Sequence, residues 1–165
     1  MMPDPLHPAV VHIPIALAVL MPLLAALALL SIQRGLMPAR VWVAIVLLQA
    51  LLVGSAWLAL ETGEEQEDRV ERIVAERHIE THEEAAERFL VIAGLGLLAV
   101  GVGLAPGRAG ATGRLVGVLV TLAVLAAGAY VGHSGGELVY RYGAANAYVE
   151  GAARPLSGGA ALDRD

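Results

Sequence analysis

The stretch AVVHIPIALAVLMPLLAALALLS, residues 9–31, decides the fold class of this chain. It contains no Asp, Glu, Lys or Arg, and a helix rising about 1.5 Å per residue needs only about 20 residues to cross about 30 Å of hydrocarbon. Three further apolar runs follow at residues 41–60, 89–104 and 115–131. Because backbone polar groups inside a bilayer must be paired within the chain, we expect all four runs to be helices. The sequence therefore predicts an all-α, antiparallel four-helix transmembrane bundle.

The composition agrees with a membrane protein and excludes several classes of function. Hydrophobic residues make up 57% of the chain and charged residues 16%, with a mean hydropathy of +0.66, whereas soluble domains carry about 25% charged residues. The absence of cysteine excludes disulfides, thiolate metal sites, iron–sulfur clusters and covalently attached haem. A net charge of −5 gives no support for a nucleic-acid partner. No cleavable signal peptide is expected, because no basic residue precedes the long first run.

The polar sequence before the third apolar run is expected to supply the start of its helix, because that run is too short to span a bilayer alone. Thr81 with Glu84 three residues later forms a capping-box pattern, which predicts a helix start near His82. The fourth run reaches a spanning length if His133 lies at its end. Both histidines are thus expected at helix ends near the membrane surface.

The connection between the second and third helices, residues 61–88, is long and rich in carboxylates. Val70, Ile73 and Val74 recur inside it at helical spacing. A helix with one apolar stripe and many charges lies at an interface, so we expect a short amphipathic helix on the membrane surface within this acidic connection.

The distribution of basic residues predicts the orientation. Both short loops carry arginines without any acidic residue. The positive-inside rule therefore places these loops in the cytoplasm and the acidic connection and both termini outside, in a multi-pass protein of the bacterial inner (cytoplasmic) membrane. We further expect a transmembrane domain at 1–143 and an extracytoplasmic C-terminal tail at 144–165. The arginines of the short loops are Arg34, Arg40, Arg108 and Arg114.

The predicted topology gathers the five histidines toward the outer face of the membrane. Neutral imidazole is the commonest metal ligand and an axial ligand of haem iron, and facing helices of a bundle can present two such rings to one iron. Each of these histidines also suits a simpler role as an interfacial or helix-capping residue. We take His12, His82 and His133 as the strongest ligand candidates and His7 as a further one. The five are His7, His12, His78, His82 and His133.

Small residues surround His133 in the segment GHSGGELVY, residues 132–140. Gly132, Gly135 and Gly136 remove side-chain bulk beside the imidazole, which permits a sharp turn after the helix or the close approach of a flat ligand such as a porphyrin. An ordinary glycine helix stop explains the same pattern.

Two longer motifs carry a family resemblance: LHPAVVHIPIAL at residues 6–17 and GHSGGELVYRYG at residues 132–143. Together with shorter matches at 62–64 and 82–83, they resemble a bacterial family of four-helix membrane proteins catalogued only as a domain of unknown function. The resemblance implies a four-helix bundle. Some relatives look fused to c-type cytochrome modules, which implies redox work. This sequence includes no such module, so we expect any electron partner to be a separate protein.

Three functions remain open. The first is a membrane-embedded, redox-associated subunit that binds b-type haem at the outer face and works with other membrane subunits or a periplasmic electron carrier. The second is a cofactor-free structural subunit of a respiratory or photosynthetic complex, because Gly94, Gly96, Gly101 and Gly103 permit close helix packing. The third is a metal-binding membrane protein that holds one Zn, Cu or Fe ion. The haem candidates are His7, His12, His82, His133, Gly132, Gly135 and Gly136, and the metal candidates are His12, His82, His133, Glu61, Glu83 and Glu137.

No sequence feature indicates an enzyme or a transporter. Ser134 next to His133 lacks the context of a nucleophile elbow. No ionisable residue interrupts the middle of an apolar run, and no inverted repeat marks a transport pathway.

Overall fold

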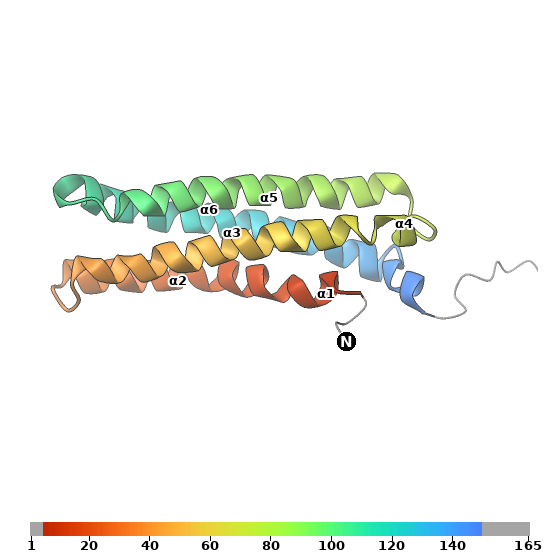
Figure 1. Ribbon diagram of the computed structural model, residues 1–165, viewed down its shortest axis with the longest axis horizontal. Coiled ribbons are helices and arrows are strands. Elements are labelled where there is room, and N and C mark those ends of the chain that lie inside the picture. The colour runs from red at the N-terminus through yellow and green to blue at the C-terminus, as the bar shows by residue number, and fades with distance from the viewer. Residues whose placement is uncertain (1–4, 150–165) are drawn as a thin grey trace, which may run out of the picture.

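Four long helical segments run antiparallel to one another in the computed structural model, which describes residues 5–149 (Figure 1). Each segment is long and apolar enough to cross a membrane, which confirms the predicted four-helix bundle. No strand occurs within the described range. The elements are α1 (His7–Val10), α2 (His12–Gln33), η1 (Ala39–Val41), α3 (Trp42–Glu64), α4 (Glu67–Val70), α5 (Glu76–Val102), α6 (Gly107–Tyr140) and η2 (Ala144–Tyr148).

The two ends of the bundle carry opposite charges. At one end lie the α2–α3 and α5–α6 turns, with Arg34, Arg40 and Arg108; we call this the basic end. At the other lie α1, α4 and the end of α6, together with the carboxylates of residues 61–87; we call this the acidic end (Figure 1). Helix α1, the long middle connection and the end of α6 therefore share one end.

The helices bury a narrow face and expose apolar side chains on the rest of their surface. In the most apolar 18-residue stretch of α6, only 17% of the residues are buried. Leu47, Val91 and Leu98, on α3 and α5, are each more than 60% exposed. Exposed apolar surface of this extent is unfavourable in water and favourable against lipid tails. The exposed faces are what a lipid-facing bundle requires.

Trp42 fills the core near the basic end, where glycines make room for it. Its indole is fully buried, and Nε1 donates a hydrogen bond of 2.8 Å to the carbonyl oxygen of Val100. A Cβ atom at Gly103 would overlap this ring, and one at Gly117 would lie 3.1 Å from Cζ2. Gly103 thus permits close packing of α3 against α5, as the sequence predicted for glycines of the third helix.

The other glycines of α5 divide into two kinds. A Cβ at Gly96 would meet Gln49 and Val120 at 3.1 and 3.2 Å, so this position also permits a close helix contact. Gly94 and Gly101 have nothing within 4 Å of such an atom. They do not serve contacts within the bundle.

The start of α5 differs from the sequence prediction. The helix begins at Glu76 after Ala75, which has an extended conformation, so the prediction of a start near His82 was wrong. Thr81 caps nothing: it lies inside the helix, and its hydroxyl donates to the carbonyl of Arg77 at 2.7 Å. The earlier start of α5 allows Ile79 to be buried against Val74, and this burial stabilises the helical turns before His82.

The end of α6 also differs. The helix continues seven residues past His133, to Tyr140, so the prediction that it ends at His133 was wrong. Leu138 is buried on this extension, and Glu137 pairs with Arg141 at 2.9 Å. The chain turns only at Gly143, whose φ of +76° suits a residue without a side chain.

The acidic connection contains a helix, but a shorter one than expected. α4 spans only Glu67–Val70, and Ile73 and Val74 follow it in a turn. Val74 is 3% exposed and packs in a small cluster with Ile79, Leu138 and Ala144. The apolar residues of the connection therefore cover the acidic end of the bundle itself.

The same cluster bears on the predicted domain division. Ala144, the first residue of η2, is buried in it, so the chain stays attached to the bundle just beyond residue 143. Most of the predicted tail, residues 150–165, lies outside the described range. The division at 143 stays a prediction.

Candidate functional site

His7 is held at the acidic end by the last turns of α3. Its Nδ1 lies 2.8 Å from the carbonyl oxygen of Ala59 and 3.5 Å from the hydroxyl of Thr62. A carbonyl oxygen only accepts hydrogen bonds, so Nδ1 carries the proton and donates it. The neutral ring then keeps the lone pair of Nε2. Gly63 makes room for the ring, since a Cβ there would lie 3.2 Å from Cε1 of His7.

His82 is held in a similar way by α6. Its Nδ1 lies 2.9 Å from Oγ of Ser134, and that hydroxyl donates its own hydrogen to the carbonyl of Val131 at 3.0 Å. Because the hydroxyl has a single hydrogen, Nδ1 of His82 is the donor of the shorter bond, and Nε2 again keeps its lone pair. Gly135 lies against the ring, where a Cβ atom would come within 3.0 Å of Cε1.

The imidazoles of His7 and His82 are neighbours in space, and we call these two residues the histidine pair. Their ring centroids are 6.5 Å apart and their planes are inclined at 84°, an edge-to-face arrangement. Four helices contribute to this site, since α1 and α5 carry the rings while α3 and α6 accept their Nδ1 protons. Histidines that ligate metals typically donate their other ring N–H to such an acceptor, which fixes the ring and its tautomer.

His12 and His133 lie elsewhere on the helices. Both are exposed, on α2 and α6 respectively. A Cβ at Gly128 would lie 3.4 Å from the Cβ of Ala18, which fixes the register of these two helices. His12 lies six residues and His133 five residues farther toward the acidic end, about 9 and 7.5 Å along the helices. The two are thus at similar depth but do not join the histidine pair.

The remaining predicted site residues are dispersed. A Cβ at Gly132 or Gly136 would meet nothing within 4 Å, so Gly135 alone of the three glycines contacts an imidazole. Glu61 is exposed and Glu83 partly so. Glu137 accepts a hydrogen bond from Arg141. Within residues 5–149, no group of three or more His, Cys, Asp or Glu side chains is arranged to hold a metal ion.

His78, which was not among the strongest candidates, has a structural contact. Its ring stacks on Tyr142 with centroids 3.8 Å apart and planes inclined at 15°. The stack joins the start of α5 to the segment that follows α6.

Comparison with known proteins identifies the family. The sequence model of a family described as "Predicted membrane protein (DUF2231)" matches residues 3–148. The chain belongs to this family. The match confirms the resemblance found in the sequence and supports a membrane protein of unknown function. Neither the curated proteins nor the solved structures contain a match.

The family motifs contain site residues that the sequence analysis did not select. Ser134 was rejected as a nucleophile, yet it accepts the Nδ1 proton of His82. Gly63 and Thr62, in the match at 62–64, surround His7. A hydroxyl residue followed by glycine occurs in both motifs, as Thr62-Gly63 and as Ser134-Gly135, and this repeated pair could have indicated the two contacts. Ala59, whose backbone carbonyl binds His7, left no signal, because any residue type supplies that group.

Proposed function

We propose that this protein is a membrane-embedded, redox-associated subunit in which His7 and His82 would hold a b-type haem. The observation that carries the proposal is the state of the histidine pair. Each Nδ1 proton is donated to an oxygen of a neighbouring helix, so in the neutral ring each Nε2 keeps a lone pair that can bind a metal ion. Paired imidazoles give a six-coordinate iron, and such iron suits electron transfer.

The separation of the rings supports this role. Two imidazoles bound to the same iron, each with a metal–nitrogen bond of about 2.0 Å, would have ring centroids roughly 6 Å apart. The centroids of His7 and His82 are 6.5 Å apart. Bound haem would supply one-electron chemistry, while the chain's own residues would orient the two rings and keep them neutral.

The number of protein ligands favours haem over a bare ion. A porphyrin supplies four nitrogens, so two imidazoles complete the coordination of its iron. A closed zinc site takes four protein ligands and a catalytic one takes three. The described residues offer no such group. A Zn, Cu or Fe ion at the histidine pair would need ligands from solvent or from another protein.

Orientation and partners follow from charge. By the positive-inside rule, the basic end lies in the cytoplasm and the acidic end outside the bacterial inner membrane, with both termini. Glu64, Glu67 and Glu80 repel Glu83 near the histidine pair. We propose that this negative surface receives a cationic electron carrier or another subunit, because opposite charges steer association.

A cofactor-free structural subunit is the second candidate. The hydrogen bonds of His7 and His82 also tie α1 to α3 and α5 to α6, which stabilises the bundle without any ligand. The broad exposed apolar faces, including Leu47 and Leu98, offer contact area to neighbouring membrane subunits as well as to lipid.

An absorption spectrum distinguishes the candidates. The detergent-purified protein, expressed with a haem supply and reduced with dithionite, is expected to show the sharp α-band of b-type haem. His82→Ala and His7→Ala are expected to abolish it, while His12→Ala and His133→Ala, matched changes at exposed positions, leave it intact. If the band is lost only in His12→Ala and His133→Ala, the haem ligands are these exposed histidines and not the histidine pair. A colourless protein that co-purifies with a complex supports the structural candidate, and one with stoichiometric metal supports an ion site.

A further inference from the structure

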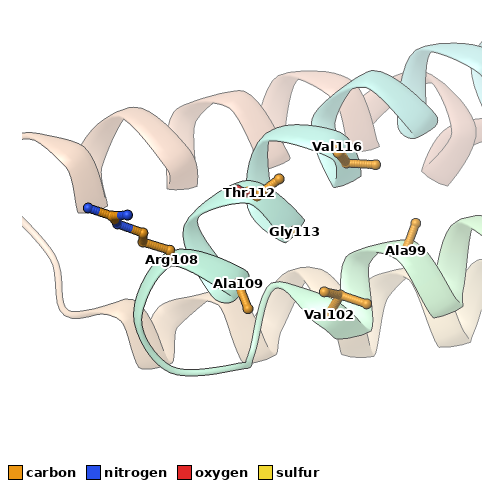
Figure 2. Close-up of a pocket in the computed structure, with 7 residues that line it drawn as sticks. All are labelled: Ala99, Val102, Arg108, Ala109, Thr112, Gly113 and Val116. Carbon is orange, nitrogen blue, oxygen red and sulfur yellow. The ribbon is translucent and has the colours of Figure 1, made fainter.

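An apolar groove lies at the basic end, far from the histidine pair. It has a volume of about 450 Å³ and runs between the end of α5 and the start of α6 (Figure 2). Small residues create it, because they leave the space between two closely packed helices unfilled. Its lining comprises Ala99, Val102, Ala109, Thr112, Gly113 and Val116, with Arg108 at the rim.

The floor of the groove is set by a backbone contact. A Cβ at Gly113 would come within 2.7 Å of the backbone nitrogen of Gly103 and the carbonyl carbon of Val102, so α5 and α6 are in direct contact there. Beside that contact, Ala109 and Val102 point into the open space (Figure 2). The hollow lies on the outside of the bundle, because Val102, Ala109 and Val116 are all exposed.

Arg108 supplies a charge without a counterion. Its side chain extends from the first turn of α6 toward the end of the bundle, and it is exposed (Figure 2). Among residues 5–149 it forms no ion pair, and the first turn of α6 holds no acidic residue. Arg114 differs, because its guanidinium is buried and donates to the carbonyl of Gly103 at 2.7 Å. Arg108 is therefore available to an anion in the headgroup region.

We propose that the groove between α5 and α6 binds one anionic phospholipid, with an acyl chain along the small residues and the phosphate on Arg108. Both parts of such a lipid match the site: the groove is apolar, and the basic end carries arginines with no acid in either turn. Basic pockets between transmembrane helices bind anionic headgroups in this manner. The inference depends on the bundle spanning a membrane and not on haem binding.

Lipid titration followed by native mass spectrometry tests the proposal. The full-length protein in detergent is titrated with phosphatidylglycerol and with phosphatidylcholine of the same acyl chains. One arginine at a membrane surface contributes about 1 kcal/mol, so we expect about a fivefold preference for phosphatidylglycerol. Arg108→Gln is expected to remove the preference, and Ala109→Leu, which fills the groove, to weaken binding of both lipids.

Arg34→Gln is the matched control, because it removes an exposed charge from the same end but outside the groove. It is expected to keep the preference. The proposal is overturned if Arg34→Gln reduces the preference as much as Arg108→Gln, since binding would then follow diffuse surface charge. Unchanged binding in Ala109→Leu overturns it as well, because the acyl chain would not occupy the groove.

Discussion

The imidazole of His82 lies directly against the backbone of Gly135, so that a Cβ atom at this position would come within 3.0 Å of Cε1. The contact explains why a glycine is needed in the interior of α6, where its conformational freedom would otherwise be a cost. It also provides a way to move one imidazole without changing any histidine.

Gly135→Ala is expected to displace His82 from Ser134 and to lower haem affinity about tenfold or more, the usual effect of disturbing a group that orients a ligand. Titration of the apoprotein with haem measures this affinity. Gly136→Ala is the matched control, because a Cβ there meets nothing within 4 Å. It should retain affinity and gain up to about 1 kcal/mol in helix stability. Equal affinity in both variants would show that the ring position is irrelevant.

Ser134→Ala removes the acceptor of the Nδ1 proton of His82. A buried donor left without a partner costs about 1–3 kcal/mol, so we expect a lower thermal midpoint in detergent even without haem. Ser134→Thr retains the hydroxyl and is expected to restore most of the loss. If Ser134→Ala melts at the wild-type temperature, the hydrogen bond does not hold the ring.

Near the basic end, Gly103→Ala is expected to destabilise the bundle by about 1–3 kcal/mol, because the added methyl group overlaps the indole of Trp42 in a filled core. Gly101→Ala lies two residues earlier in the same helix and faces open space, so it should be neutral or slightly stabilising. Urea or thermal unfolding in detergent compares the two. Similar losses in both would mean that the Trp42 contact does not limit substitution at residue 103.

The absence of cysteine makes the orientation directly testable. Glu71→Cys and Leu36→Cys place single thiols at exposed positions of the acidic and basic ends. In intact bacterial cells, a membrane-impermeant maleimide is expected to label the first, whereas the second reacts only after the inner membrane is permeabilised. The opposite pattern would reverse the predicted orientation and place the histidine pair on the cytoplasmic side.

Sequence reasoning predicted the number of helices and the end at which the histidines gather, because both depend on hydropathy and length. It did not predict which way each ring faces. His82 points into the bundle and His133 points out of it, although Ser134, the residue after His133, is buried. The direction of each ring is set by the rotation of its own helix, α5 for His82 and α6 for His133, and a hydropathy pattern does not determine that rotation. The choice of His7 as the partner of His82 required the structure.

Helix ends were missed for a related reason. Thr81 with Glu84 fits a capping box, and the glycines after His133 fit a helix stop, yet both lie inside helices. Local preferences of about 1 kcal/mol were outweighed by the burial of Ile79 and Leu138 at the acidic end. These contacts join residues far apart in the chain, so no local pattern shows them.

The length of α6 determines how the histidine pair is approached. Its 34 residues extend about 51 Å, whereas the hydrocarbon layer is about 30 Å thick. A helix of this length exceeds the hydrocarbon layer by about 20 Å, so we expect its final turns, beside His82, to reach the headgroup region. At that depth, water-soluble reductants and metal chelators would reach the histidine pair without first partitioning into lipid.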